Sequence, residues 1–178
     1  AEWDQEGGKE WNYLTNGAAI RDYWARRLKA NGRYENVYTL GMRGKDDEPM
    51  TGGKTMAEKI GLMERIFADQ RELLAWHVNP EVTHVPQVFI PYTEVLGIYD
   101  SGLKVPGDVM ICWPDDNFGY IRRLPTAAEQ TRSGGSGIYY HIQWLDGAAT
   151  SDTWLNTTPP LLIWEEMSKA WQYGAKNL

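Results

Sequence analysis

The sequence predicts an α/β protein with a parallel sheet, in the form of an incomplete (β/α)8 TIM-type barrel. Short, continuously apolar strands alternate with helices along the chain, which is typical of parallel βαβ units whose sheet is covered on both faces. We count four such strands in 178 residues, whereas a complete barrel takes about 250 residues. We therefore expect about four consecutive βα units, with residues 1–178 forming a fragment of one catalytic barrel domain truncated at both ends.

The first half of the chain predicts a helix, a strand and a second helix. Apolar residues at helical spacing run through residues 11–32 and stop at an Asn-Gly pair. Residues 36–42 (NVYTLGM) predict a buried strand, and the polar segment 43–53 predicts a long connection after it. Thr55 and Glu58 form a capping box. The helix that they open has apolar positions at Ile60, Met63, Ile66, Phe67 and Leu74.

The second half repeats this alternation. Residues 85–90 (VPQVFI) predict a second strand, and Thr93 is expected to cap the short helix that follows. Residues 108–113 and 137–144 predict the third and fourth strands. The last helix is expected to open at Thr158 and Pro159 and to end at Gly174, so the next strand is expected only beyond the end of the chain.

Composition excludes several classes of function. The net charge is −6 and Lys and Arg form no stripe, so we expect no nucleic-acid partner. Because Cys112 is the only cysteine, neither a disulfide framework nor a cysteine zinc site is available. His77 and His84 show no metal-ligand spacing, so no metal is expected. No run approaches the roughly 20 apolar residues of a membrane span, and no signal-peptide pattern opens the chain.

Candidate catalytic groups lie where the predicted strands end, as they do in barrel enzymes. After the first strand come Arg43 and the acidic run Asp46, Asp47 and Glu48; Glu94 follows the second, Asp115, Asp116 and Asn117 follow the third, and His141 lies within the fourth. Glu94 is placed for general acid or base catalysis, although an acid in a first helical turn is also favoured by the helix dipole. Asp115, Asp116 and Asn117 are also ordinary turn formers, and a lone strand histidine is more often a core or supporting group.

Three further features each have two interpretations. The Gly/Ser-rich segment RSGGSG at 132–137 is either a phosphate cradle or a flexible loop, and it lacks the Lys-Ser/Thr of a P-loop. Trp113, Trp144 and Trp154 either stack on sugar rings or fill the core. Arg43, Arg122 and Arg123 either pair with a substrate carboxylate or form ordinary ion pairs.

Several segments together resemble the catalytic barrel of family 115 glycoside hydrolases, the xylan α-1,2-glucuronidases: LGMRGKDDEPM, FIPYTEVLGIYDSGLKVPGDV, WPDDNFGYIRRLP, RSGGSGIYYH and WLNTTPPLLIWEEMSKA. The resemblance spans nearly the whole chain. It implies an inverting hydrolase, secreted or periplasmic, that needs no cofactor and removes glucuronic acid or its 4-O-methyl ether from glucuronoxylan or its oligosaccharides.

The resemblance also implies roles for individual residues. Asp47 and Glu94 would be the catalytic carboxylates, without saying which is the acid and which the base. Arg43, Asp115, Asn117 and His141 would bind or position the substrate, and the remainder of the parent chain would complete the pocket. Two alternatives stay open: a carbohydrate-binding remnant without turnover, and a phosphosugar-acting barrel enzyme that uses the segment 132–137.

Overall fold

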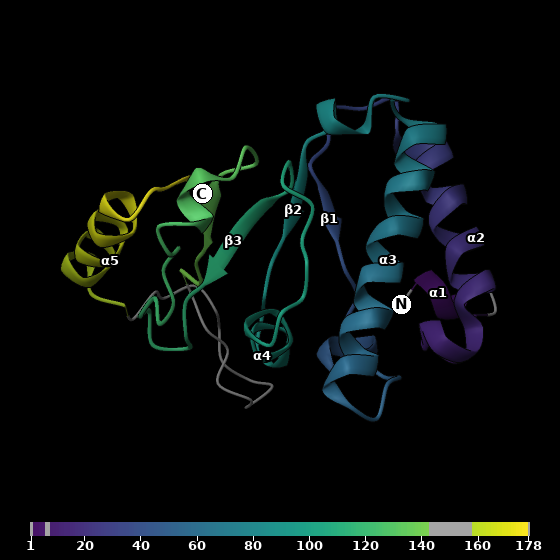
Figure 1. Ribbon diagram of the computed structural model, residues 1–178, viewed down its shortest axis with the longest axis horizontal. Coiled ribbons are helices and arrows are strands. Elements are labelled where there is room, and N and C mark those ends of the chain that lie inside the picture. Colours follow the sequence, from purple (N-terminus) through teal and green to yellow (C-terminus); the bar gives the residue numbers. More distant parts are fainter. Residues whose placement is uncertain (1, 6–7, 143–157, 178) are drawn as a thin grey trace. The chain divides into compact units, whose positions relative to one another are not determined.

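The computed structural model describes residues 2–5, 8–142 and 158–177. The chain divides into two compact units, one of Ala1–Phe89 with Thr93–Pro106 and one of Ile90–Tyr92 with Gly107–Leu178. Each unit contains helices and parallel strands (Figure 1). The predicted α/β class with parallel strands is therefore confirmed.

The first unit is mainly helical. Its regular elements are α1 (Glu2–Gln5), α2 (Tyr13–Asn31), β1 (Tyr38–Leu40), α3 (Met56–His77), β2 (Gln87–Phe89) and α4 (Glu94–Asp100), with single 3-10 turns at Lys45–Asp47 and Val82–His84. The long helices α2 and α3 lie side by side (Figure 1). Strand β1 pairs in parallel with β2, with Leu40 opposite Phe89.

Helix α3 follows the prediction closely. Glu58 N–H donates to the Thr55 hydroxyl at 3.2 Å, and Thr55 N–H donates back to the Glu58 carboxylate at 3.0 Å, so the capping box is confirmed. The apolar stripe faces inward, and Phe67 meets Phe89 of β2 edge to face with ring centroids 5.3 Å apart. Gln70 exchanges two hydrogen bonds with the backbone of Gly41, at 2.8 and 3.1 Å. Helix α3 thus holds the chain where β1 ends and the loop to α3 begins.

The first predicted strand is shorter and less buried than expected. Of residues 36–42 only Tyr38–Leu40 pair as β1, Thr39 is exposed, and the Val37 side chain is 61% exposed. The prediction of a buried strand was wrong for this face. Apolar character alone did not reveal that one side of β1 lacks a covering layer among the described residues.

The second unit contains one strand more than predicted. Its elements are β3 (Met110–Pro114), a 3-10 turn at Glu129–Thr131, β4 (Ser136–Tyr139), α5 (Pro160–Gln172) and β5 (Ala175–Asn177). Strands β3, β4 and β5 pair in parallel in that order. The expectation that the next strand lies beyond the chain was wrong, because Ala-Lys-Asn has no apolar run and becomes a strand through its pairing with Ser136 and Gly137.

Strand β4 also differs from its prediction. It ends at Tyr139, so His141 lies two residues beyond the strand rather than within it. Gln143 and Trp144 lie outside the described residues. A side chain at Gly137 would meet Asn177 O at 2.9 Å and Cys112 Sγ at 3.0 Å, so only glycine fits between the neighbouring strands.

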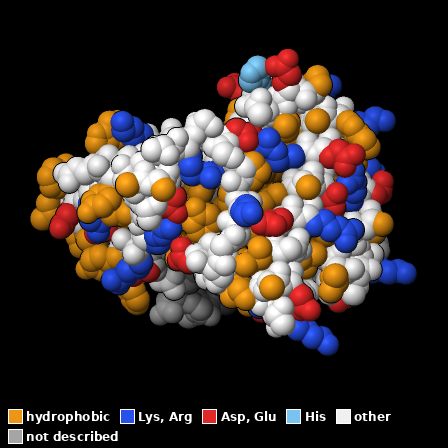
Figure 2. Space-filling model, viewed as in Figure 1, with side chains coloured by type: hydrophobic (Ala, Val, Ile, Leu, Met, Phe, Trp, Pro, Cys, Tyr) orange, Lys and Arg blue, Asp and Glu red, His pale blue; other side chains and the backbone are white. Residues whose placement is uncertain are grey.

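Helix α5 opens with Pro160 at its first turn, close to the predicted start. Its outer face carries hydrophobic side chains (Figure 2), and Leu161, Trp164 and Trp171 are exposed there. Among residues 2–5, 8–142 and 158–177, no helix has the length and apolar character needed to cross a membrane.

Candidate active site

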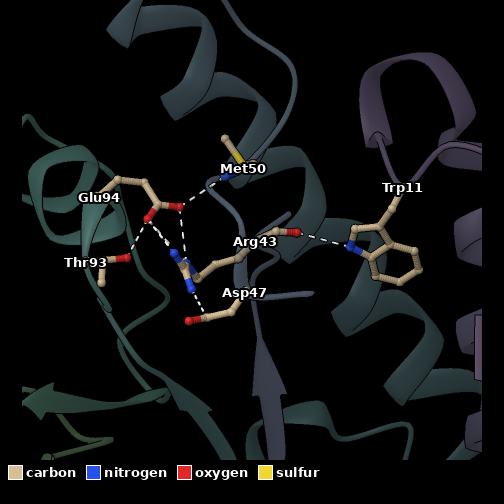
Figure 3. Close-up of polar contacts among 6 residues, drawn as sticks. All are labelled: Trp11, Arg43, Asp47, Met50, Thr93 and Glu94. Carbon is tan, nitrogen blue, oxygen red and sulfur yellow. Dashed lines mark hydrogen bonds and ion pairs between the residues drawn. The ribbon is translucent and has the colours of Figure 1, made fainter. Parts of the chain in front are cut away.

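Arg43 and Glu94 form the centre of the candidate site in the first unit (Figure 3). Arg43 Nη2 donates to Glu94 Oε2 at 2.9 Å, and Arg43 Nε lies 3.2 and 3.3 Å from the two carboxylate oxygens. Met50 N–H donates to Oε1 at 3.1 Å, and the Thr93 hydroxyl donates to Oε2 at 2.5 Å. The chain thus presents Glu94 as an ion with fixed partners on both oxygens.

Asp47 contacts the same guanidinium from the opposite side. Arg43 Nη1 donates to Asp47 Oδ1, so one arginine joins the two predicted catalytic carboxylates (Figure 3). Asp47 lies in the 3-10 turn after β1 with φ of +67°, and its side chain is 71% exposed. Both carboxylates therefore lie close together, bridged by one guanidinium.

The electrostatics of Glu94 favour its charged form. Burial raises the pKa of Glu94, but hydrogen bonds from Arg43, Thr93 and Met50 N–H outweigh this and hold the pKa below its ordinary value. The prediction that Thr93 caps α4 was wrong: its hydroxyl donates to the neighbouring carboxylate instead. Thr93 has φ of +47°, which is unfavourable for a β-branched residue. The turn before α4 is therefore arranged around Glu94 rather than around the helix end.

Asp115 and His141 form a separate pair in the second unit. The Asp115 side chain is fully buried, and its Oδ1 lies 2.6 Å from His141 Nδ1. The backbone N–H of His141 donates to both carboxylate oxygens, at 3.0 and 3.1 Å. Since an ionised carboxylate only accepts, this contact places a hydrogen on Nδ1 of the ring. Asp115 is thus an orienting group for His141 rather than a turn former.

Two tyrosines flank the His141 ring. Tyr139 meets it edge to face at 5.0 Å and Tyr92 lies 5.7 Å away. Burial raises the pKa of Asp115, and the hydrogen bonds from His141 offset this only in part, so the pKa stays above its ordinary value. The two rings therefore flank a pair whose side chains are largely buried.

The remaining candidate residues in this unit lie in the loop that follows β3. Asp116 Oδ1 accepts from Phe118 N–H at 2.8 Å and from Tyr120 N–H at 3.0 Å, so Asp116 is the turn former that its residue type predicts. Asn117 is exposed on this turn. Arg122 pairs with Asp116 at 2.6 Å.

Two further predictions are corrected by burial and packing. Trp113 is fully buried, with Arg123 over its ring at 4.1 Å, so it belongs to the core and cannot stack on a sugar. Arg123 itself pairs with Glu129 at 2.5 and 2.7 Å. Trp144 and Trp154 lie outside the described residues.

The segment RSGGSG packs against its own unit. Gly134 N–H donates to Gly107 O at 2.9 Å, and Gly135 N–H donates to Arg132 O at 3.1 Å. A side chain at Gly134 would lie 2.4 Å from the backbone carbon of Val109. These two amides are already used within the protein, so they are not available to bind a phosphate.

No group of three or more His, Cys, Asp or Glu side chains with the geometry of a metal site occurs in the described part of the chain.

Residues that the sequence did not indicate as site residues also contribute to the first site. The Thr93 hydroxyl, the Met50 amide and Trp11, whose indole N–H donates to Arg43 O at 3.1 Å, carry no distinctive sequence signal.

Fold and site together define an α/β protein with two carboxylates on one arginine at the carboxyl ends of parallel strands, an arrangement suited to acid–base chemistry on a polar substrate. The chain belongs to glycosyl hydrolase family 115, whose sequence model matches residues 1–178. It is similar to a solved family 115 4-O-methyl-α-glucuronidase, BtGH115A, described as specific for decorated arabinogalactans, with 46% identity and a TM-score of 0.93. The similarity covers 99% of this chain and 23% of that one. A search of curated proteins found no match.

Proposed function

We propose that this chain contributes the catalytic carboxylates of a glycoside hydrolase that releases glucuronic acid, or its 4-O-methyl ether, from a plant polysaccharide. The observation that carries the proposal is the bridge Asp47–Arg43–Glu94 in a chain of family 115. Inverting hydrolysis needs one acid to protonate the leaving oxygen and one carboxylate to activate water. Asp47 and Glu94 are these two groups.

The lowered pKa of Glu94 supports one division of roles within the pair. A general acid must carry a proton, whereas Glu94 is held as an ion by Arg43 and two further donors. Glu94 is therefore the base that activates water, and Asp47 is the acid.

Arg43 gives the site its preference for a uronic acid. Its guanidinium is shared between Glu94 and the exposed Asp47. A substrate carboxylate that pairs with Arg43 displaces the more exposed acid, Asp47. The motifs that resemble family 115 also nominate Asp115, Asn117 and His141 of the second unit for substrate binding.

Two polysaccharides are candidate substrates. Glucuronoxylan, in which the uronic acid is α-1,2-linked to xylose, is the substrate implied by the sequence motifs, and the protein would act outside the cell in partnership with the remainder of its parent barrel. Decorated arabinogalactan is the second candidate, because the similar solved enzyme is described as specific for it. Uronic acid release from both polymers by the full-length protein, followed by NMR of the product anomer, distinguishes them and tests inversion.

The catalytic pair is tested by Glu94→Gln and Asp47→Asn in the full-length protein. We expect each to reduce uronic acid release by at least about 1,000-fold, because each removes an acid–base group. Glu48→Gln, an exposed acid of the same loop, is the matched control and should stay within about twofold of the parent. Near-normal turnover by both variants would overturn the assignment. Retained binding of the oligosaccharide by a parent protein that releases no uronic acid would instead support the carbohydrate-binding alternative.

A further inference from the structure

We propose that Trp11 is a positioning residue for the catalytic loop, defined as residues 43–51. Its indole Nε1–H donates to the backbone O of Arg43 at 3.1 Å (Figure 3), and the Thr51 hydroxyl donates to the backbone O of Trp11 at 2.9 Å. One residue, which lies just before α2, therefore holds both ends of the loop. This inference rests on the proposed function, since it concerns how Arg43 is placed.

The indole ring is itself held in place by other aromatic rings. Trp3, Tyr23 and Trp24 meet it edge to face, with centroids at 5.2, 6.3 and 6.4 Å and interplanar angles of 71°, 84° and 82°. Edge-to-face pairs favour a defined ring orientation. The position of Nε1 is therefore set by α1 and α2, and the catalytic loop adapts to it.

The far end of the loop also packs closely on the start of α2. Gly52 has φ of +98°, and a side chain there would lie 3.1 Å from Asn12 Oδ1 and 2.9 Å from Leu62 Cδ2. Asn12 is the residue that caps α2, through its acceptance of Leu14 N–H at 3.0 Å. The loop thus has little room to shift along the helix without losing the contacts of Trp11.

Arg43 connects this support to the catalytic carboxylates. Its backbone oxygen accepts from Trp11, while its side chain reaches Glu94 and Asp47. A guanidinium that contacts two acids at once tolerates little displacement of its own backbone, and small misplacements in an active site are costly. Loss of the indole donor is therefore expected to act at Glu94 rather than on the fold as a whole.

The test is Trp11→Phe in the full-length protein, which keeps an aromatic ring and removes the N–H donor. We expect kcat/KM to fall by about 2- to 10-fold, the range of one neutral hydrogen bond. We also expect the acidic limb of its pH profile to move to higher pH, because a less well placed Arg43 lets the pKa of Glu94 rise. Trp76→Phe is the matched control: this tryptophan lies on α3, is 68% exposed and is not one of the three rings named above, and its replacement should leave rate and profile unchanged.

A second readout does not depend on activity. Amide hydrogen exchange across residues 43–51 should be faster in Trp11→Phe, and to a smaller extent in Thr51→Val, than in Trp76→Phe. If Trp11→Phe does not fold, Thr51→Val carries the test with the same readouts. Parental exchange and pH profile in Trp11→Phe, or equal changes in Trp76→Phe, would overturn the inference. If Arg43→Met keeps its activity, the proposed function is wrong, whatever the result for Trp11→Phe.

Discussion

Each unit of the chain holds one carboxylate with a shifted pKa, and the two shifts have opposite signs. In the first unit Glu94 accepts hydrogen bonds from Arg43, Thr93 and Met50, which hold its pKa down. In the second unit Asp115 is fully buried with His141 as its partner, and its pKa is raised. Hydrogen bonds from a permanent cation and two further donors lower the pKa of the first acid, and burial raises that of the second.

This difference separates two uses of an acid in one chain. A carboxylate held as an ion suits a base or a partner that orients an arginine. A buried acid beside a histidine suits the choice of ring tautomer, because its hydrogen bond to Nδ1 decides which nitrogen carries the hydrogen. Residue type alone does not distinguish these uses, since both acids follow a strand.

Of the changes that distinguish the two units, loss of the Arg43 guanidinium is expected to have the largest effect. Arg43→Met removes the cation that joins the two acids, and uronic acid release should fall by at least about 100-fold, as for loss of one charge-stabilising group. Arg43→Lys keeps the positive charge but loses the planar guanidinium that contacts both acids. It should therefore recover only part of the lost rate. Arg26→Met, whose exposed pair with Asp22 lies on α2, should stay near the parent. A Met variant with parental rates would break the distinction between the two sites.

A smaller effect is expected from the buried acid. Asp115→Ala leaves the backbone N–H and ring of His141 without their acceptor, which costs about 1–3 kcal/mol. The midpoint of thermal unfolding of the full-length protein should fall accordingly. Asp22→Asn, in an exposed ion pair, is the control and should change stability by less than about 1 kcal/mol. Equal midpoints for the two variants would show that Asp115 does not support its unit.

The smallest effect is a difference in pH dependence. The folded-state pKa of Glu94 is lowered, so its contribution is present above the unfolded value of about 4.3 and is lost as pH falls through the folded value. The pKa of Asp115 is raised, so the parent loses stability as pH rises through that value. The deficit of Glu94→Gln should therefore shrink in acid, and that of Asp115→Asn should shrink toward neutral pH. Unfolding midpoints measured between pH 3 and 7 check both, and parallel curves would contradict the assignment.

Prediction from sequence succeeded where the signal is local. The capping box at Thr55 and Glu58 and the apolar stripe of α3 each depend on residues a few positions apart in the chain. Both are confirmed. The strand β5 escaped prediction because Ala-Lys-Asn has no apolar run, and its conformation depends on pairing with β4. Thr93 was misassigned because its hydroxyl can either accept from the N–H groups at the start of α4 or donate to the Glu94 carboxylate, and it does the second.

The sequence by itself determined the α/β class, the position of acids after strands and, through long motifs, the family to which the chain belongs. Only the tertiary structure decided which of these acids meet a cation and which are buried. It joined Arg43 to Glu94 across 51 positions, and Asp115 to His141 across 26. The physical reason is that charge state depends on distance and burial, which residues far apart in the chain acquire only when the strands that carry them pack.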